Sequence, residues 1–254
     1  MKEIISLKNP LIKEVKKLHK RKYREEKKAY LLEGFHLLEE AQNFGAEFEW
    51  LFFTERGKNE WMDWLDRQEE GIKIFLSDEA MKAISEQPSP QGIVAVVKMT
   101  ENILPERFEG GWLLLDNVQD PGNVGAMIRT ADAAGLAGVV LGSGAVDIYN
   151  AKVMRAMQGS NFHLPIFREK LPRIISKMQE DDIKVYGTKL DKDAVSLKEL
   201  PVTENFAILM GNEGQGVSEE LLDLTDENVY IKMKGQAESL NVAVACGILL
   251  FHFA

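Results

Sequence analysis

Short apolar runs that stop abruptly at a polar residue or a glycine constrain the fold of this 254-residue chain more than any other feature. Residues 113–115 are LLL and are followed by Asp116, while residues 139–141 are VVL and are followed by Gly142. A strand without polar side chains needs cover on both faces, and helices supply that cover in mainly parallel sheets. The runs therefore predict an α/β fold for the second half of the chain.

Strand and helix patterns alternate through this half. The expected strands share an apolar centre and lie at 112–118, 137–143, 162–167, 183–188, 206–212 and 229–233. The expected helices lie at 123–134, 150–158, 171–180, 218–224 and from 239 to 254. This alternation predicts a mostly parallel sheet with helices on both faces. The last helix is apolar nearly all round, so we expect it to be buried against the sheet or a partner subunit.

The first half predicts a smaller α/β unit. It begins with a helix that carries Leu11, Val15 and Leu18 at helical spacing and basic residues on its other face. The expected strands lie at 29–34, 48–55, 72–78 and 91–99, and the expected helices between them at 35–45, 59–71 and 78–87. Polar and turn residues at 100–110 break the pattern. We therefore expect an N-terminal domain at 1–99, a linker at 100–110 and a second domain at 111–254.

The net charge of −9 hides an asymmetry along the chain. Residues 1–28 contain eleven Lys and Arg against four Glu, whereas the rest of the chain contains 20 basic and 36 acidic residues. A basic segment on an acidic body suggests an anionic partner, with nucleic acid as the leading candidate. The alternative is a solvated helix face without a partner.

Several classes of protein are disfavoured by the sequence. The N-terminus is charged and lacks the apolar core of a signal peptide, and the longest apolar run is too short for a membrane span. The single Cys246 lies in an apolar stretch, as is typical of an inert core thiol in a reducing compartment. We therefore expect a soluble, cytoplasmic protein without membrane association.

Familiar cofactor and metal motifs are missing. The four histidines are scattered, and no His, Cys or carboxylate cluster has the spacing of metal ligands, so no metal is expected. The dinucleotide fingerprint, the P-loop and the serine nucleophile elbow are absent as well. This disfavours a dehydrogenase or a methyltransferase with an ordinary Rossmann fold.

Three polar, glycine-containing segments remain, each next to an expected strand. The first, DNVQDPGNVGAMIRTADAAG, places Asn123 and Arg129 less than two helical turns apart, and small residues surround the arginine. An arginine offers five permanent donors in a rigid fork that suits phosphate or carboxylate. The segment therefore predicts an anion close to Arg129, although a carboxylate such as Asp132 or Glu213 could pair with it instead.

The other two segments are LMGNEGQGVSEELL and IKMKGQAESLNVAVA. In the second segment Glu213 stands among glycines that allow close approach to a ligand, and in the third Ser239 and Asn241 open the last expected helix. Turns and a helix N-cap are the plain explanations of each segment alone. Because ligands bind at the carboxyl ends of strands in open α/β sheets, three such loops in one domain favour a site.

NVGAMIRTADAAG, LMGNEGQGV and ESLNVAVACGILL, in this order and spacing, resemble the three motifs of the SpoU/TrmH family of S-adenosylmethionine-dependent RNA ribose 2′-O-methyltransferases, within the SPOUT superfamily. The resemblance covers roughly residues 110–254, and KKAYLLEGFHLLEEA more loosely resembles the start of the family's small substrate-binding domain. It implies a parallel sheet whose C-terminal part forms a trefoil knot, a homodimer through the knot helices, and S-adenosylmethionine as the cofactor without a metal. The cofactor-binding residues implied by position are Thr188, Lys189, Leu209, Met210, Gly211, Gly216, Ile231, Met233, Ser239, Leu240 and Ala243.

The resemblance also implies roles for five site residues. Arg129 matches the arginine regarded as catalytic, and the residues that match the other motif positions are Asn123, Glu213, Ser239 and Asn241. One departure is Lys232, which stands where the family commonly has a proline. It could alter the cofactor loop or add a phosphate contact.

RNA, and 23S rRNA in particular, is the substrate that the resemblance implies, because an added N-terminal domain is typical of the members that act on rRNA. The basic segment supplies candidate phosphate contacts, which are Lys13, Lys16, Lys17, Lys20, Arg21, Lys22 and Arg24, together with Arg129. A tRNA methyltransferase and a non-catalytic RNA-binding or ribosome-assembly factor remain as alternatives. The five intact motif residues argue against the non-catalytic one.

Overall fold

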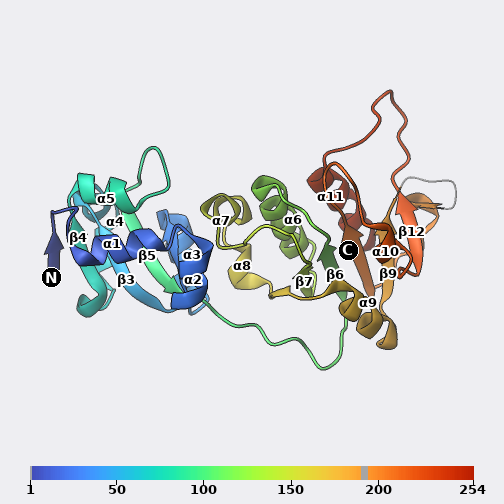
Figure 1. Cartoon of the computed structure of the whole chain (residues 1–254), viewed down its shortest axis with the longest axis horizontal. Coiled ribbons are helices and arrows are strands. Elements are labelled where there is room, and N and C mark those ends of the chain that lie inside the picture. The colour runs from blue at the N-terminus through green and yellow to red at the C-terminus, as the bar shows by residue number, and fades with distance from the viewer. Residues whose placement is uncertain (1, 190–193) are drawn as a thin grey trace. The chain divides into compact units, whose positions relative to one another are not determined.

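The computed structural model describes residues 2–189 and 194–254. Contacts divide the chain into two compact units. The first comprises residues 1–101 and 149–162, and the second comprises residues 102–148 and 163–254. The segment 149–162 therefore packs with the first unit, although it lies between strands of the second in sequence (Figure 1).

The first unit is built on a five-stranded mixed sheet. Its strands, in the sheet order β1-β4-β3-β5-β2, are β1 (Lys2–Ile4), β4 (Lys73–Leu76), β3 (Phe48–Phe53), β5 (Ile93–Lys98) and β2 (Ala29–Glu33). Its helices are α1 (Pro10–Lys17), α2 (Arg21–Lys27), α3 (Phe35–Asn43), α4 (Glu55–Asp66), α5 (Asp78–Ile84) and α7 (Ala151–Met157). Strand β5 runs antiparallel to both β2 and β3, whereas β1 and β3 run parallel to β4.

Helix α1 forms because Asn9 caps its first turn and Pro10 opens it. Its apolar stripe places Ile12 and Val15, with Leu18 just beyond, in the core beneath the sheet, while its lysines stay in solvent. The basic segment that we expected to form one helix is divided in two at residues 18–20. The short strand β1 was not predicted from the sequence.

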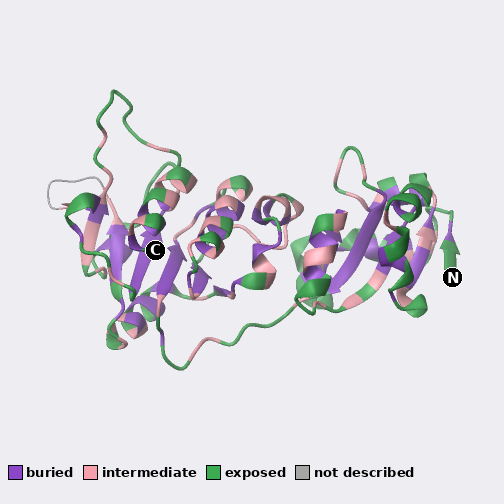
Figure 2. Ribbon diagram, turned by 180° about the vertical axis from the view of Figure 1, so that it is seen from behind, coloured by how far each residue is buried: buried purple, intermediate pink, exposed green. Residues whose placement is uncertain are grey.

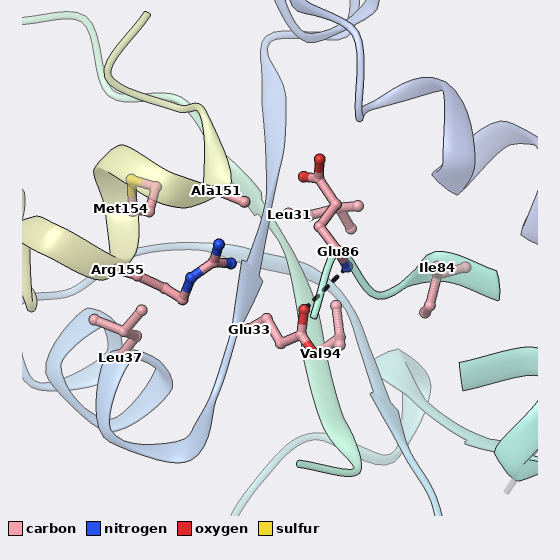
Figure 3. Close-up of a pocket in the computed structure, with 9 residues that line it drawn as sticks. All are labelled: Leu31, Glu33, Leu37, Ile84, Glu86, Val94, Ala151, Met154 and Arg155. Atoms are coloured by element: carbon pink, nitrogen blue, oxygen red, sulfur yellow. Dashed lines mark hydrogen bonds between the residues drawn. The ribbon is translucent and has the colours of Figure 1, made fainter. Parts of the chain in front are cut away.

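A small cavity lies where α7 packs on β2 within the first unit. Arg155 of α7 extends toward the strand that carries Glu33 (Figure 3). Burial raises the pKa of the Glu33 carboxyl, while hydrogen bonds from Ser85 and the Glu86 amide and the charge of Arg155 oppose that shift. A volume of about 10 Å³ admits at most one water molecule, so this cavity is not a ligand site.

The second unit is built on a seven-stranded sheet in which every pair is parallel. In the sheet order β10-β12-β9-β11-β6-β7-β8 its strands are β10 (Val195–Ser196), β12 (Glu227–Tyr230), β9 (Lys184–Thr188), β11 (Phe206–Met210), β6 (Gly111–Leu115), β7 (Gly138–Leu141) and β8 (Ile166–Arg168). Its helices are α6 (Pro121–Ala133), α9 (Leu171–Glu180), α10 (Glu219–Leu222) and α11 (Val242–Phe253), and the short α8 (Ser160–His163) lies at the boundary of the two units.

Helices cover both faces of this sheet, as the apolar runs predict, and its central strands are buried (Figure 2). Helices α9 and α10 pack with Leu114, Val185 and Leu209 on one face. On the other face Phe253 of α11 stacks on Tyr186 and Phe206. The predicted α/β fold class with a mostly parallel sheet is thus confirmed. The trefoil knot stays a prediction.

Several expected elements were placed wrongly. The helix expected at 59–71 is α4, which begins at Glu55 because Thr54 caps its first turn, and the strand expected at 229–233 is β12, which ends at Tyr230. The strand expected at 162–167 begins only at Ile166, because residues 160–163 form α8. The last helix was expected from residue 239 but begins at Val242, because Asn241 caps it through bonds from the amides of Ala243 and Val244. Strand β10 was not predicted.

Candidate functional site

Three loops converge at the carboxyl edge of the seven-stranded sheet. Residues 116–120 follow β6 and lead into α6, residues 211–218 follow β11, and residues 231–241 follow β12 and lead into α11. Because all seven strands run in the same direction, these strand ends share one edge although they are far apart in sequence. They are the three segments that the sequence singles out.

A cavity of about 550 Å³ opens among the ends of β9, β11 and β12 and the loops that follow them. The predicted cofactor residues that line it are Thr188, Lys189, Met210, Gly211, Gly216, Ile231, Met233, Ser239 and Leu240. Leu209 does not line the cavity: it is fully buried, and its carbonyl accepts a 2.9 Å hydrogen bond from the Thr188 hydroxyl. Ala243 lies in the first turn of α11 and does not line the cavity either.

Gly211 permits the backbone of the second loop to fold tightly against itself. A β-carbon at this position would lie only 2.1 Å from the carbonyl carbon of Gly216 and the amide nitrogen of Val217. Asn212 and Gly216 exchange two backbone hydrogen bonds that close the turn, at 3.0 and 2.8 Å. The glycine is therefore required by packing, and it also leaves the cavity wall without a side chain.

Hydrogen bonds join the three loops through Asn123, Glu213 and Asn241. The Asn123 amide nitrogen donates to Glu213 Oε1 over 3.1 Å, and its amide oxygen accepts from Asn241 Nδ2 over 3.0 Å. The backbone amide of Asp120 donates to the same Glu213 oxygen at 3.1 Å. Asn241 meanwhile uses its oxygen to cap α11. One side chain from each motif thus holds the loops together.

The Glu213 carboxylate is kept ionised by this arrangement. Partial burial alone would raise its pKa, but hydrogen bonds from Asn123 and from nearby backbone amides, including that of Asp120, lower the pKa below its ordinary value. A charged carboxylate accepts several donors at once, so it suits a junction between loops better than a neutral group does.

Arg129 lies on α6, within the same 13-residue helix as Asn123, but it is exposed and does not line the cavity. Across residues 2–189 and 194–254 it makes no hydrogen bond or ion pair, and Asp132, an expected partner, instead contacts His163 at 2.9 Å. Glu213, the other expected partner, is engaged by Asn123. The guanidinium is therefore available to an external anion.

Ser239 is exposed at the cavity, in the loop ahead of α11 rather than in its first turn. The prediction that it opens the helix is wrong because Asn241 occupies the N-cap. Its hydroxyl makes no hydrogen bond within the part of the chain that the structure describes.

Some site residues were missed from the sequence. Asp116 accepts the Ser218 amide at 2.9 Å, and the Asn212 side chain donates to the Asn117 carbonyl at 3.0 Å, so both brace the first two loops. Polar residues directly after an apolar strand were the available signal. Tyr230 and Lys232 line the cavity as well, Lys232 being the departure from the family pattern.

The basic N-terminal segment is only partly free to contact phosphate. Arg24 is 4% exposed and donates to the Leu18 carbonyl at 2.7 Å, so its prediction as a phosphate contact is wrong. Lys17 and Arg21 are exposed but pair with Glu14 and Glu25. The residues Lys13, Lys16, Lys20 and Lys22 are exposed.

Membrane-spanning helices and metal clusters are both absent from the described residues. None of the helices in this part of the chain is long and apolar enough to cross a membrane. Likewise, residues 2–189 and 194–254 contain no group of three or more His, Cys, Asp or Glu side chains that could hold a metal ion.

An all-parallel sheet that gathers three linked loops around a cavity at its carboxyl edge defines a ligand-binding α/β domain. Residues 112–251 match the SpoU rRNA Methylase family, and residues 9–95 match the MRM3-like substrate binding domain. The chain therefore belongs to the SpoU rRNA methylase family, and the resemblance found in the sequence is confirmed.

Relatives and solved structures agree with this assignment. The chain is 47% identical over 253 residues to the 23S rRNA (guanosine(2553)-2′-O)-methyltransferase RlmP of Bacillus subtilis (strain 168), with 99% of each protein covered. It is 34% identical to the 23S rRNA (guanosine-2′-O-)-methyltransferase RlmB of Escherichia coli (strain K12) over 195 residues, covering 73% of this chain and 80% of the relative. The crystal structure of an AdoMet-bound rRNA methyltransferase from Sinorhizobium meliloti superposes with a TM-score of 0.85 at 31% identity, covering 99% of this chain and 96% of that one.

Proposed function

We propose that this protein transfers a methyl group from S-adenosylmethionine to a ribose 2′-hydroxyl of 23S rRNA. The observation that carries the proposal is the hydrogen-bonded set Asn123, Glu213 and Asn241, which joins the three family motifs beside the cavity. The activities named for RlmP and RlmB support the rRNA substrate.

The cavity suits S-adenosylmethionine in size and chemistry. Its volume of about 550 Å³ falls within the roughly 300–1,000 Å³ typical of small-molecule sites. Met210, Ile231 and Leu249 supply apolar walls, and the bare backbone at Gly211 lets a flat ring approach closely. When bound, this cofactor supplies a methyl group on a positively charged sulfur.

Positioning is the main contribution of the chain's own residues. Arg129, which is exposed and unpaired among the described residues, binds the phosphate next to the target ribose and helps to remove the 2′-hydroxyl proton. A guanidinium holds its protons tightly and is a poor base, so that second role depends on polarisation by the bound phosphate. Asn123, Glu213 and Asn241 hold the loops, and Ser239 offers a free hydroxyl at the cavity.

We also propose a homodimer through α11 in the cytoplasm. Val244, Ile248 and Phe251 recur at helical spacing on this helix and are 52%, 41% and 58% exposed. An exposed apolar stripe of this kind favours burial against another chain. The trefoil knot at the C-terminal part of the second domain belongs to the same proposal.

The proposed domain roles divide binding from chemistry. Residues 1–99 recognise RNA, with the exposed Lys13, Lys16, Lys20 and Lys22 contacting phosphate. Residues 100–110 connect the domains, and residues 111–254 bind the cofactor and carry out the transfer. The match of residues 9–95 to a substrate binding domain supports this division.

Labelled methyl transfer to total RNA from a strain lacking this gene tests the proposal. We expect label in one nucleotide of 23S rRNA as a 2′-O-methyl group. Label in tRNA would retain the chemistry and overturn the substrate. An absence of both cofactor binding and label would favour an RNA-binding factor without activity.

A further inference from the structure

A second hollow lies in the first unit, between α1 and the sheet. It measures about 290 Å³, close to the lower end of the range for small-molecule sites. Val15 of α1 and Leu18, directly after the helix, form one wall, and Ala29 of β2 and Val96 of β5 lie across from them on the sheet. The small side chain of Ala29 leaves room above the strand. The hollow can thus take a ring system but not a folded partner.

A β-bulge brings Glu49 and Trp50 of β3 to this hollow together. The pairing of β3 with β5 shifts register between Phe48 and Trp50, so Glu49 has no partner opposite it. In a regular strand, neighbouring side chains point to opposite faces of the sheet. The extra residue removes that alternation locally, and both side chains line the same hollow. Bulges often re-aim side chains in this way at binding sites.

The two side chains differ in chemistry. Trp50 is partly exposed, and the ammonium of Lys2 lies 5.8 Å from the centroid of its ring. The Glu49 carboxylate makes no hydrogen bond or ion pair among the residues that the structure describes, whereas the nearby Glu14 pairs with Lys17 at 2.6 Å. The hollow therefore combines a partly exposed aromatic ring with a carboxylate that has no hydrogen-bond donor among the described residues.

We propose that this hollow takes up one unpaired nucleobase of the RNA substrate, which stacks on Trp50 and donates hydrogen bonds to Glu49. Unpaired bases are recognised in this way, by aromatic stacking and by bonds to their Watson–Crick edges. An ionised carboxylate only accepts hydrogen bonds. Guanine presents two adjacent N–H donors on that edge, whereas adenine and cytosine present one donor beside an acceptor, so guanine is preferred.

The hollow is lined by the carboxylates Glu14 and Glu49, and two lysines stand at its edge. The Lys2 ammonium lies over one face of the Trp50 ring, which leaves the other face for a base, and the exposed Lys27 lines the rim without a hydrogen bond or ion pair in the described part of the chain. These cations can contact the phosphates that flank a base held in the hollow. The inference rests on the proposed function for the identity of the substrate. It adds a base-specific contact to the first unit, because phosphate contacts alone do not distinguish one RNA sequence from another.

The test uses the full chain and the pentaribonucleotides UUGUU, UUAUU, UUCUU and UUUUU. Tryptophan fluorescence and direct binding are measured for the wild type and for Trp50→Phe, Trp50→Ala and Glu49→Gln, with Trp61→Phe as the matched control on α4. We expect UUGUU to bind most tightly and to quench fluorescence, with the quench lost in Trp50→Phe. Trp50→Ala should weaken binding by between about 5- and 150-fold, and Glu49→Gln should remove the preference for guanine.

Unchanged UUGUU binding in Trp50→Ala, or a guanine preference that survives Glu49→Gln, would overturn the proposal. Binding of RNA without any quench attributable to Trp50 would do so too, because the RNA would then be held elsewhere. Thermal melting of each variant separates weaker binding from a failure to fold, and Glu49→Gln, at an exposed position, keeps the test valid if Trp50→Ala unfolds. Wild-type methyl transfer to rRNA is measured alongside. An absence of methyl transfer contradicts the proposed function. Normal methyl transfer by a protein whose hollow binds none of the oligonucleotides contradicts only this inference.

Discussion

The two sheets of the molecule bring polar groups together in different ways. In the parallel sheet of the second unit every strand ends at the same edge, so Asn123, Glu213 and Asn241 meet from three distant loops. In the mixed sheet of the first unit β5 runs against its neighbours, so the strand ends are divided between two edges. Glu49 and Trp50 gather there on a face, through a bulge. In the parallel sheet the polar side chains therefore meet in loops at one edge, whereas in the mixed sheet they lie on one face of the sheet.

Loss of Arg129 should have the largest effect, because the proposed chemical step takes place at the parallel edge. We expect Arg129→Ala to lower the rate of methyl transfer on the order of a hundredfold or more, with a smaller loss of RNA affinity. Turnover and KM are measured separately with labelled cofactor. Arg173→Ala, at an exposed position on α9, is the matched control. Full turnover in Arg129→Lys would show that the guanidinium fork is not needed.

Substitution of Gly211 should have the next largest effect. The added β-carbon of Gly211→Ala would meet backbone atoms of Gly216 and Val217 at 2.1 Å, and backbone cannot move aside cheaply. We expect a loss of about 1–3 kcal/mol of stability and at least tenfold weaker cofactor binding by calorimetry. At Gly214 the nearest atom to an added β-carbon is 3.7 Å away, so Gly214→Ala should match the wild type. Equal behaviour of the two variants would be evidence against a tightly packed loop.

Removal of exposed charge from the first unit should have a moderate effect spread over several residues. The triple change Lys13→Gln, Lys16→Gln and Lys20→Gln should weaken RNA binding and lower the slope of log K against log salt by up to about 0.7 for each phosphate that is no longer neutralised. Binding titrations at several salt concentrations measure that slope. Lys58→Gln and Lys82→Gln, at exposed positions elsewhere in this unit, should leave it unchanged. A slope that persists in the triple variant would place the phosphate-binding residues outside the segment 13–20.

The smallest expected effect concerns the charge of Glu213. Its folded-state pKa lies below the ordinary 4.5, so the ionised carboxylate contributes stability above that pH and the contribution is lost as the pH falls through the folded pKa. Urea unfolding at pH 7 and pH 4 should show Glu213→Gln slightly less stable than the wild type at pH 7, with a smaller difference at pH 4. Glu220→Gln serves as the control. A difference in stability between Glu213→Gln and the wild type that is larger at pH 4 than at pH 7 would contradict a lowered pKa for Glu213.

The same contrast explains what could be predicted from the sequence. Apolar runs and loop motifs predicted the parallel sheet and brought Asn123, Glu213 and Asn241 together correctly, because strand direction alone places these loops. Burial of Arg24 depends on how α2 packs against the rest of the unit, and the local sequence does not determine this packing. The bulge at Glu49 changes one register step without a sequence marker. The start of α11 was predicted too early because Ser239 and Asn241 are both suitable capping residues, and the structure uses Asn241.

The bond between Asn123 and Asn241 joins residues 118 positions apart, and that between Asn123 and Glu213 joins residues 90 positions apart. Contacts of such long range form only after the chain has closed large loops, so parallel sheets fold slowly. The site should then be among the last parts of the molecule to assemble during folding. Recovery of cofactor binding would therefore lag behind the return of secondary structure, and a newly made chain would pass through a compact state that cannot yet act.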